Sequence, residues 1–135
     1  MRVPEPFHDT NVVLYLFSSD PTKADRAESL LAGGGRVSVQ VLNELVAVAR
    51  RKLGMSWSEV AEAVTIVRAV CGVEPLTLET HDRARLLAER YALHIYDALI
   101  VAAALLAGCS VLYSEDLQSG QKIDGKLAII NPFRT

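Results

Sequence analysis

Residues 95–116 read Ile-Tyr-Asp-Ala-Leu-Ile-Val-Ala-Ala-Ala-Leu-Leu-Ala-Gly-Cys-Ser-Val-Leu-Tyr-Ser-Glu-Asp, an apolar segment followed by a short apolar run that ends in acids. The longest apolar run, Ala98–Ala107, is about half the length needed to cross a membrane, so we expect a buried helix over Ile95–Leu106. We expect a buried strand over Ser110–Tyr113, with Asp116 just past its end. The combination predicts an α/β domain with an acid at one edge of its sheet.

The rest of the chain also alternates between short apolar runs and helical periodicity. The predicted elements are a strand over Val37–Val39, a helix over Leu42–Leu53 that Gly54 closes, a helix from Ser56 to about Val70, a strand over Val73–Leu78, a helix over Glu79–Arg90 and a final strand over Leu127–Ile130. Ser56 and Glu59 have the spacing of a capping box. Strands that alternate with helices predict a three-layer α/β/α domain, in which a central parallel sheet is flanked by helices. Ligands in such folds bind beyond the carboxyl ends of the strands.

Length and composition set broad limits. The 135 residues suit one domain spanning 1–135, and a formal charge of −2 gives no general attraction to nucleic acid. Cys71 and Cys109 lie far apart without CxxC spacing, so we expect buried thiols rather than a disulfide or a zinc site. The segment Met1–Pro6 lacks the apolar core of a signal peptide. These features favour a cytoplasmic protein with no membrane segment.

Four of the sixteen acids lie beside apolar segments rather than among polar residues: Asp9, Glu44, Asp97 and Asp116. A carboxylate near a core is costly unless it is paired or binds a cation, and the neighbouring sequence supplies few cationic partners. Each acid alone also has an ordinary explanation. Asp9 and Asp97 can serve as helix caps or first-turn acids, Glu44 as a first-turn acid and Asp116 as a turn residue. The four together favour one site for a hard divalent ion.

Four short motifs resemble the acidic signature of the PIN-domain family, and most closely the VapC-type toxins of toxin–antitoxin pairs. They are Phe7-His8-Asp9-Thr10-Asn11, Asn43-Glu44, Tyr96-Asp97-Ala98 and Ser114-Glu115-Asp116-Leu117, in this order. The resemblance extends from Phe7 to the Asn131-Pro132-Phe133 tail. The position before Asp9 is usually apolar in the family, and His8 departs from this pattern. By strand alternation, His8 should point away from Asp9.

The resemblance implies a Mg²⁺- or Mn²⁺-dependent endoribonuclease that cleaves RNA phosphodiester bonds with a metal-activated water. Carried over by position, Asp9 and Asp97 are the principal ligands, and Glu44 and Asp116 hold a second ion or orient water. Ser114 is expected to bond to a carboxylate or to the phosphate. Asn11 is expected to orient Asp9. Glu115 has no assigned role.

The family resemblance also implies partners: an RNA substrate, a cognate antitoxin that inserts a segment into the acidic pocket, and a second copy of the chain in a homodimer. The apolar segments Val12–Phe17 and Val41–Leu53 are the predicted contact faces. Arg50-Arg51-Lys52 fits a helix C-terminus better than an RNA contact. For Trp57 and Tyr15 we expect burial in the core or in an interface.

Three alternatives compete with this interpretation. One is a non-catalytic PIN-like module that binds RNA or protein and keeps the acids only as caps; it is weaker because all four positions are acidic. The second is a response-regulator receiver. That fold needs adjacent acids at the first strand and a lysine after a late strand, and neither is present. The third is a nuclease that acts on structured DNA rather than RNA.

Overall fold

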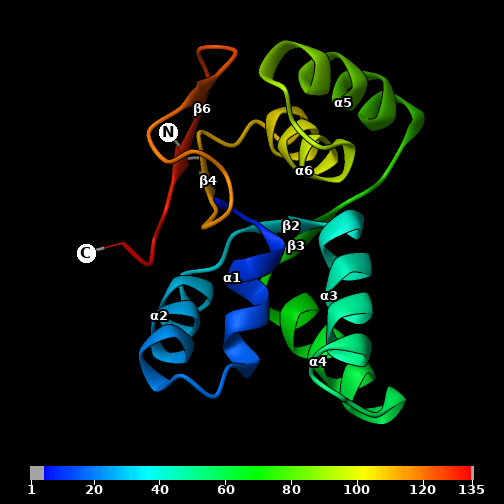
Figure 1. The fold of residues 1–135 in the computed structure, drawn as a ribbon, viewed down its shortest axis with the longest axis vertical. Helices are drawn as coiled ribbons and strands as arrows, with labels where there is room; N and C mark the ends of the chain where they lie inside the picture. Colours follow the sequence, from blue (N-terminus) through cyan, green and yellow to red (C-terminus); the bar gives the residue numbers. More distant parts are fainter. Residues whose placement is uncertain (1–4, 135) are drawn as a thin grey trace.

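The computed structural model describes residues 5–134, so the expectation for Met1–Pro6 lies mostly outside the described residues. In chain order the elements are β1 (Phe7–His8), α1 (Thr10–Leu14), a 3₁₀ turn η1 (Tyr15–Phe17), α2 (Pro21–Ala32), β2 (Arg36–Ser38), α3 (Val39–Arg51), α4 (Trp57–Val70), β3 (Gly72–Glu74), α5 (Leu78–Tyr91), α6 (Ile95–Leu106), β4 (Val111–Tyr113), β5 (Lys122–Ile123) and β6 (Leu127–Ile130). Figure 1 shows their arrangement.

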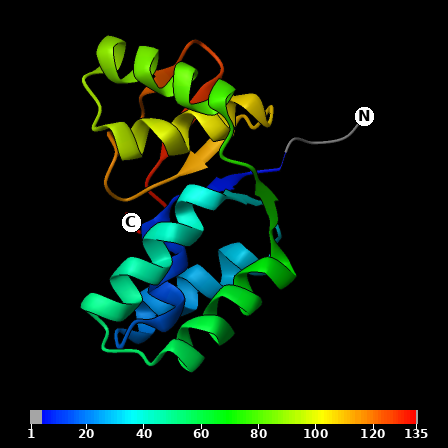
Figure 2. The same ribbon diagram turned by 90° about the vertical axis from the view of Figure 1, so that its right-hand side faces the viewer.

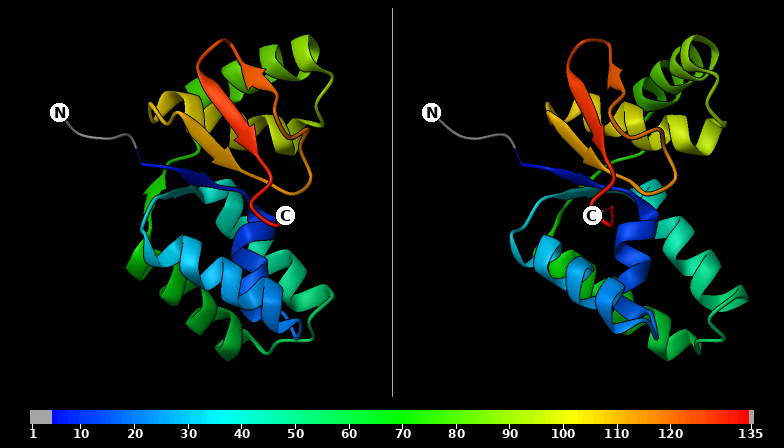
Figure 3. Two further views of the ribbon diagram at one scale, coloured as in Figure 1. Left: turned by 90° about the vertical axis from the view of Figure 1, so that its left-hand side faces the viewer. Right: turned by 60° about the vertical axis from the view of Figure 1, so that its left-hand side comes forward.

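The strands form one sheet in the order β3-β2-β1-β4-β6-β5, in which β5 is antiparallel to β6 and the other neighbouring pairs are parallel. Figure 3 shows β1, β4 and β6 side by side. Asp124 and Gly125 both have positive φ angles, 51° and 67°, as a tight hairpin turn requires, and such a turn joins antiparallel strands. The predicted α/β class with a central sheet flanked by helices is confirmed, and β5 is a departure from an all-parallel sheet.

The helices lie on two faces of the sheet, and the face depends on the direction in which the chain moves along the sheet. From β1 to β3 the chain moves one way along the sheet, and after β3 it returns to place β4 on the other side of β1. Because parallel crossovers are right-handed, this reversal moves the helices to the opposite face. Figure 2 accordingly shows α1–α4 on one side of the strands and α5 with α6 on the other.

The core lies between the sheet and these helices. Every residue of Ala98–Ala104 in α6 is buried, which confirms the predicted buried helix. Phe7 and Leu112, on neighbouring strands, are fully buried beneath it in the same apolar cluster. Cys71 and Cys109 are buried free thiols, as expected. Within residues 5–134, no helix combines the length and apolarity needed to span a membrane.

Helix caps explain where the predicted boundaries were wrong. The predicted strand Val37–Val39 ends at Ser38, because the Ser38 side chain accepts from Val41 N and starts α3 at Val39 rather than Leu42. The predicted strand Val73–Leu78 ends at Glu74, because Thr77 caps α5. The capping box of Ser56 and Glu59 is confirmed.

Trp57 was expected in the core or in an interface, and its side chain does not lie in the core of this chain. It is 64% exposed, and its ring centroid lies 4.5 Å from Cζ of Arg50. Arg50 also donates to the carbonyl of Met55 at 2.9 Å, so this arginine is engaged at the helix end.

Candidate active site

The candidate site lies where two adjacent parallel strands end. β1 and β4 pair in the centre of the sheet, with His8 opposite Tyr113, and each strand is followed at once by polar residues. The backbone N–H of Asp9 donates to the carbonyl of Tyr113 at 3.0 Å, which fixes the start of the post-β1 segment against the end of β4. The chain reverses its direction of travel between these strands, and a crevice at such a switch point is where open α/β sheets bind ligands.

Asp9 is the most enclosed of the predicted acids, with 3% of its surface exposed. It caps α1: one carboxylate oxygen accepts from Thr10 N at 2.7 Å. The other accepts from Ser114 Oγ at 2.6 Å and from Asn11 Nδ2 at 3.3 Å. The cap interpretation is therefore correct, and the contacts predicted for Ser114 and Asn11 are present.

Asn11 also connects the two strand ends. Its Nδ2 donates to Asp116 as well as to Asp9, with 3.1 Å to Asp116 Oδ2, and its Oδ1 accepts from the backbone N–H of Glu115 at 3.1 Å. The same side chain thus holds the exposed Asp116 near the buried Asp9. The backbone turn beyond β4 is held further by Leu117 N, which donates to Ser114 Oγ at 3.1 Å.

Glu44 is brought to this edge by α3, which follows the neighbouring strand β2. The interpretation of Glu44 as a first-turn acid is wrong, because α3 begins at Val39 and its first turn holds no acid. Its two carboxylate oxygens accept from Thr10 Oγ1 at 2.9 Å and from Gln40 Nε2 at 2.8 Å. Thr10 and Gln40, 6% and 8% exposed, were not predicted to contribute. Gln40 stands four residues before Glu44, so helical spacing was the available signal.

Asp97 comes from the opposite face of the sheet, in the first turn of α6, which His94 caps. Its half-buried carboxylate makes no hydrogen bond among residues 5–134, but it is electrostatically coupled to the other acids. Burial raises the pKa of Asp97, the charges of Glu44 and Asp116 raise it further, and His94 lowers it. The structure therefore brings all four predicted acids to one region: Asp9, Asp97 and Asp116 from helix or strand ends, and Glu44 from within α3.

Uncompensated negative charge distinguishes this region. Burial raises the pKa of Asp9 to about 6; bonds from Ser114 and Thr10 oppose the shift, and the charges of Asp97 and Asp116 add to it. Across residues 5–134, the ion pairs involve other acids, and none includes the four. Carboxylates that are close together and lack a basic partner favour binding of a proton or a cation.

The donor set fits a hard divalent ion. Carboxylate oxygens are the ligands that Mg²⁺ and Mn²⁺ prefer, and no sulfur or imidazole lies among the four. In the described part of the chain, no three His, Cys, Asp or Glu side chains converge tightly enough to enclose a metal. Mg²⁺ usually keeps several waters and takes one or two carboxylates directly, so close convergence is not required.

Glu115 and His8 are close in sequence to the acids of the site, but their side chains bind other partners. Glu115 accepts from the hydroxyl of Tyr15 and from Lys23 Nζ, the latter at 3.3 Å, so this acid is paired. The His8 side chain is fully buried and contacts the carbonyl oxygen of Gly34 through Nε2 at 3.0 Å. Burial lowers the pKa of His8, so a neutral ring tolerates this position.

Fold and site together define an α/β domain with a carboxylate-rich site beyond the carboxyl ends of its central strands. The family model of the PIN domain matches residues 7–122, and the chain belongs to the PIN-domain family. No curated protein matches the chain.

Several solved structures share the fold. A toxin–antitoxin complex from Klebsiella pneumoniae aligns with a TM-score of 0.71 at 19% identity, over 94% of this chain and 97% of that one. VapC20 of Mycobacterium tuberculosis, described as a toxin that cleaves the sarcin–ricin loop, aligns with a TM-score of 0.69 at 23% identity, over 82% and 89%. VapBC-1 from nontypeable Haemophilus influenzae aligns with a TM-score of 0.68 at 20% identity, over 96% and 98%.

Proposed function

We propose that this protein is a Mg²⁺- or Mn²⁺-dependent endoribonuclease that acts as the toxin of a toxin–antitoxin pair. One observation carries the proposal: Asp9, Glu44, Asp97 and Asp116 gather at the switch point of the sheet and form no ion pair among residues 5–134. Clustered negative charge that is partly buried is unfavourable for folding, and such clusters are often found at functional sites.

In this proposal each side chain has a defined task. Asp9 and Asp97 are the principal ligands, and Asp116 and Glu44 hold a second ion or orient the attacking water. A bound divalent ion supplies Lewis-acid chemistry, which activates water and neutralises charge on the phosphate. The bonds from Ser114 and Asn11 fix the Asp9 carboxylate, and those from Thr10 and Gln40 fix Glu44. Such orienting contacts keep the donors in one arrangement.

RNA is the proposed substrate class. The fold relative VapC20 is described as a toxin that cleaves the sarcin–ricin loop, which is RNA, and this supports the same polymer here. A net charge of −2 means that affinity for the RNA backbone has to come from bound cations and from local basic residues. We infer a cytoplasmic location, where two free thiols and an RNA substrate are both expected.

A cognate antitoxin is the proposed protein partner, together with a second copy of the chain. The fold relative from Klebsiella pneumoniae is described as a toxin–antitoxin complex, which supports an antitoxin partner here. A cavity of ≈ 440 Å³ between α1 and α3 is lined by Leu14, Phe17, Val48 and Leu53, which fall within the predicted contact segments. An apolar segment of an antitoxin helix would fit such a groove.

Sequencing of RNA ends tests the function directly. Purified protein incubated with total RNA should create new ends with Mg²⁺ or Mn²⁺, and EDTA should suppress them. Asp97→Asn is the matched control, because it removes one charge with almost no change in shape. RNA binding without new ends would favour the non-catalytic module instead. Cleavage of structured DNA in preference to RNA would favour the DNA nuclease.

A further inference from the structure

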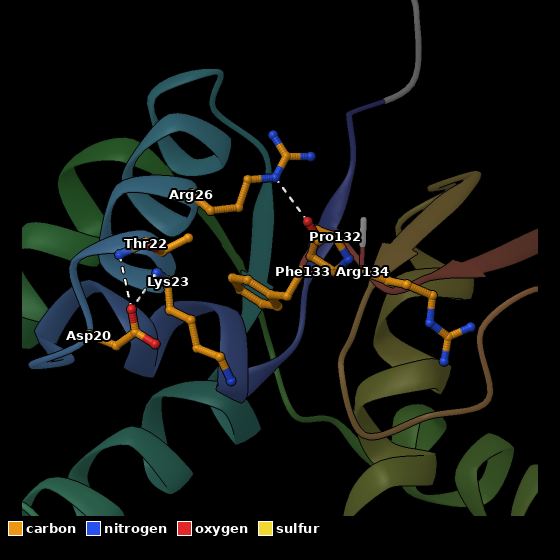
Figure 4. A pocket seen from close by; sticks show the side chains of 7 residues that line it. All are labelled: Asp20, Thr22, Lys23, Arg26, Pro132, Phe133 and Arg134. Carbon is orange, nitrogen blue, oxygen red and sulfur yellow. Dashed lines mark hydrogen bonds between the residues drawn. The ribbon is translucent and has the colours of Figure 1, made fainter.

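A second cavity lies beside the acidic site, between α2 and the C-terminal segment. It measures ≈ 410 Å³, within the range of about 300–1,000 Å³ typical of small-ligand pockets. Its lining combines the side chains of Asp20, Thr22, Lys23, Arg26, Phe133 and Arg134 with the backbone at Pro132. Figure 4 shows the Phe133 ring directed toward α2, between the side chains of Lys23 and Arg26. The cavity therefore offers an aromatic surface with cations beside it.

The charged side chains around this cavity differ in how many of their polar atoms are already hydrogen-bonded. Asp20 accepts from Thr22 N and Lys23 N as the cap of α2, so its carboxylate is occupied by the helix end. Arg26 donates through Nε to the carbonyl of Pro132 at 2.9 Å, and its two Nη atoms make no hydrogen bond with any residue in the range 5–134. Arg26 is exposed and anchored at the same time. An anchored guanidinium with free N–H groups is well suited to bind a phosphate.

Lys23 connects the cavity to the wall of the acidic site. Its Nζ lies 2.9 Å from the Tyr15 hydroxyl, 3.3 Å from Glu115 and 4.4 Å from the centroid of the Tyr15 ring. Tyr15 in turn meets Phe133 edge-on, with 4.7 Å between ring centroids. Glu115 directly precedes Asp116 in the chain. A ligand that extends from Asp116 across Tyr15 would thus reach the cavity.

Electrostatics favours binding of an RNA strand along this path, from the cavity to the acidic site. Four acids repel phosphates, and the chain as a whole is negative, so a strand needs local cations on its way to the site. Lys23, Arg26 and Arg134 line the cavity beside one carboxylate, Asp20. Because Lys23 is already paired with Glu115, Arg26 is the cation best placed to bind a phosphate. Proteins that bind single strands combine such cations with aromatic rings on which bases stack.

We propose that the cavity between α2 and Phe133 is a nucleotide subsite of the RNA substrate. The base of a nucleotide near the cleaved bond stacks on Phe133, and its phosphate binds the guanidinium of Arg26. The inference rests on the proposed ribonuclease function and extends it, because it assigns substrate positioning to residues outside the acidic site.

The test measures binding and its salt dependence. The probe is a short fluorescein-labelled single-stranded RNA of mixed sequence, with 2′-O-methyl groups that resist cleavage, followed by fluorescence anisotropy in Mg²⁺. Arg26→Gln should weaken binding and lower the slope of log K against log salt by about one, because one phosphate contact is lost. Phe133→Leu should weaken binding about fivefold or more with the slope unchanged, because stacking is lost and the charge is kept.

Arg68→Gln is the matched control, since Arg68 is an exposed arginine on α4 outside the cavity. It should leave binding within about twofold of the wild type. Thermal unfolding verifies that each variant is folded. RNA that carries 4-thiouridine should in addition crosslink to the peptide that contains Phe133, which requires no variant.

The outcomes separate the two proposals. If the wild type cleaves RNA while Arg26→Gln and Phe133→Leu bind like the wild type and no crosslink reaches Phe133, the subsite is refuted and the ribonuclease function stands. If the wild type neither cleaves nor binds RNA, both fail. Should Phe133→Leu not fold, the slope of Arg26→Gln and the crosslink decide.

Discussion

At the scale of single residues, Asp9 links the candidate site to stability. Its carboxylate is almost fully enclosed, and its pKa is raised from 3.8 to about 6. Because the native state holds this proton more strongly than the unfolded state, protonation of Asp9 favours folding. That contribution is fully present below about pH 4 and is lost as the pH rises through about 6.

Without divalent metal, the free energy of unfolding should therefore fall between pH 4 and pH 6 by about 3 kcal/mol through Asp9 alone, given a pKa that moves from 3.8 to about 6. Urea titrations in EDTA across this range measure the change. Asp9→Asn is the control, because an amide still caps α1 and cannot titrate. Equal pH slopes for the wild type and this variant would show that Asp9 does not carry the effect.

A second residue-scale prediction concerns Asp97. Asp97→Asn should reduce RNA cleavage by at least about a hundredfold, because the site loses a ligand that supporting contacts do not replace. The fold should persist, with metal-free stability equal to the wild type or slightly higher, since a charge repelled by Glu44 and Asp116 is removed. Circular dichroism and cleavage assays measure the two effects. Unfolding of this variant would mean that Asp97 is structural.

The four acids of the site could be predicted from the sequence, whereas two of the neutral residues that contact them were missed. The four acids stood out because a carboxylate beside an apolar run is unusual. Thr10 and Gln40 are ordinary neutral residues, and their role depends on where Glu44 lies in three dimensions. Neutral donors to a site carry no comparable signal in a sequence.

At the scale of elements, the predicted helices were accurate where caps or long apolar runs defined them. The helix Ile95–Leu106 and the strand Leu127–Ile130 have the predicted bounds. The start of α3 was misplaced because Ser38, a cap, lies between Val37 and Val39, which also suited a strand. The hairpin of β5 and β6 was missed, although Asp124-Gly125 is a strong hairpin dipeptide.

The capping box of α4 gives an element-scale prediction. Ser56 accepts from Glu59 N at 3.1 Å, and the Glu59 side chain accepts from Ser56 N at 2.9 Å. Ser56→Ala should lower the free energy of unfolding by about 1 kcal/mol, because Glu59 N loses its acceptor while the bond from the backbone N–H of residue 56 to the Glu59 side chain can remain. RNA cleavage should be unchanged, since α4 contributes none of the four acids. Urea unfolding and an activity assay on the same sample test both parts; lost activity in a folded variant would contradict the proposed site.

At the scale of the whole molecule, the four acids connect metal binding to global stability. A ligand that binds only the folded state raises its stability by mass action. Mg²⁺ or Mn²⁺ should therefore raise the melting temperature of the wild type in a saturable way, more at pH 7 than at pH 5, where Asp9, with a pKa of about 6, is largely protonated. Differential scanning fluorimetry measures the shift.

Two controls make the metal experiment specific. Asp9→Asn and Asp97→Asn should each show a smaller shift than the wild type, because each removes one proposed ligand. NaCl at the same ionic strength separates specific binding from general screening. If all three proteins respond equally to Mg²⁺, the ion does not bind among these acids.

The pairing of β1 with β4 has a consequence for synthesis of the protein. Asp9 is translated well before Asp116, yet both must flank the same pair of strands. While β4 is still inside the exit tunnel of the ribosome, β1 has no β4 with which to pair. At that stage Asp9 lacks two of its contacts, those with Tyr113 and Ser114. Any activity that depends on these acids can arise only after β4 and Asp116 have left the exit tunnel.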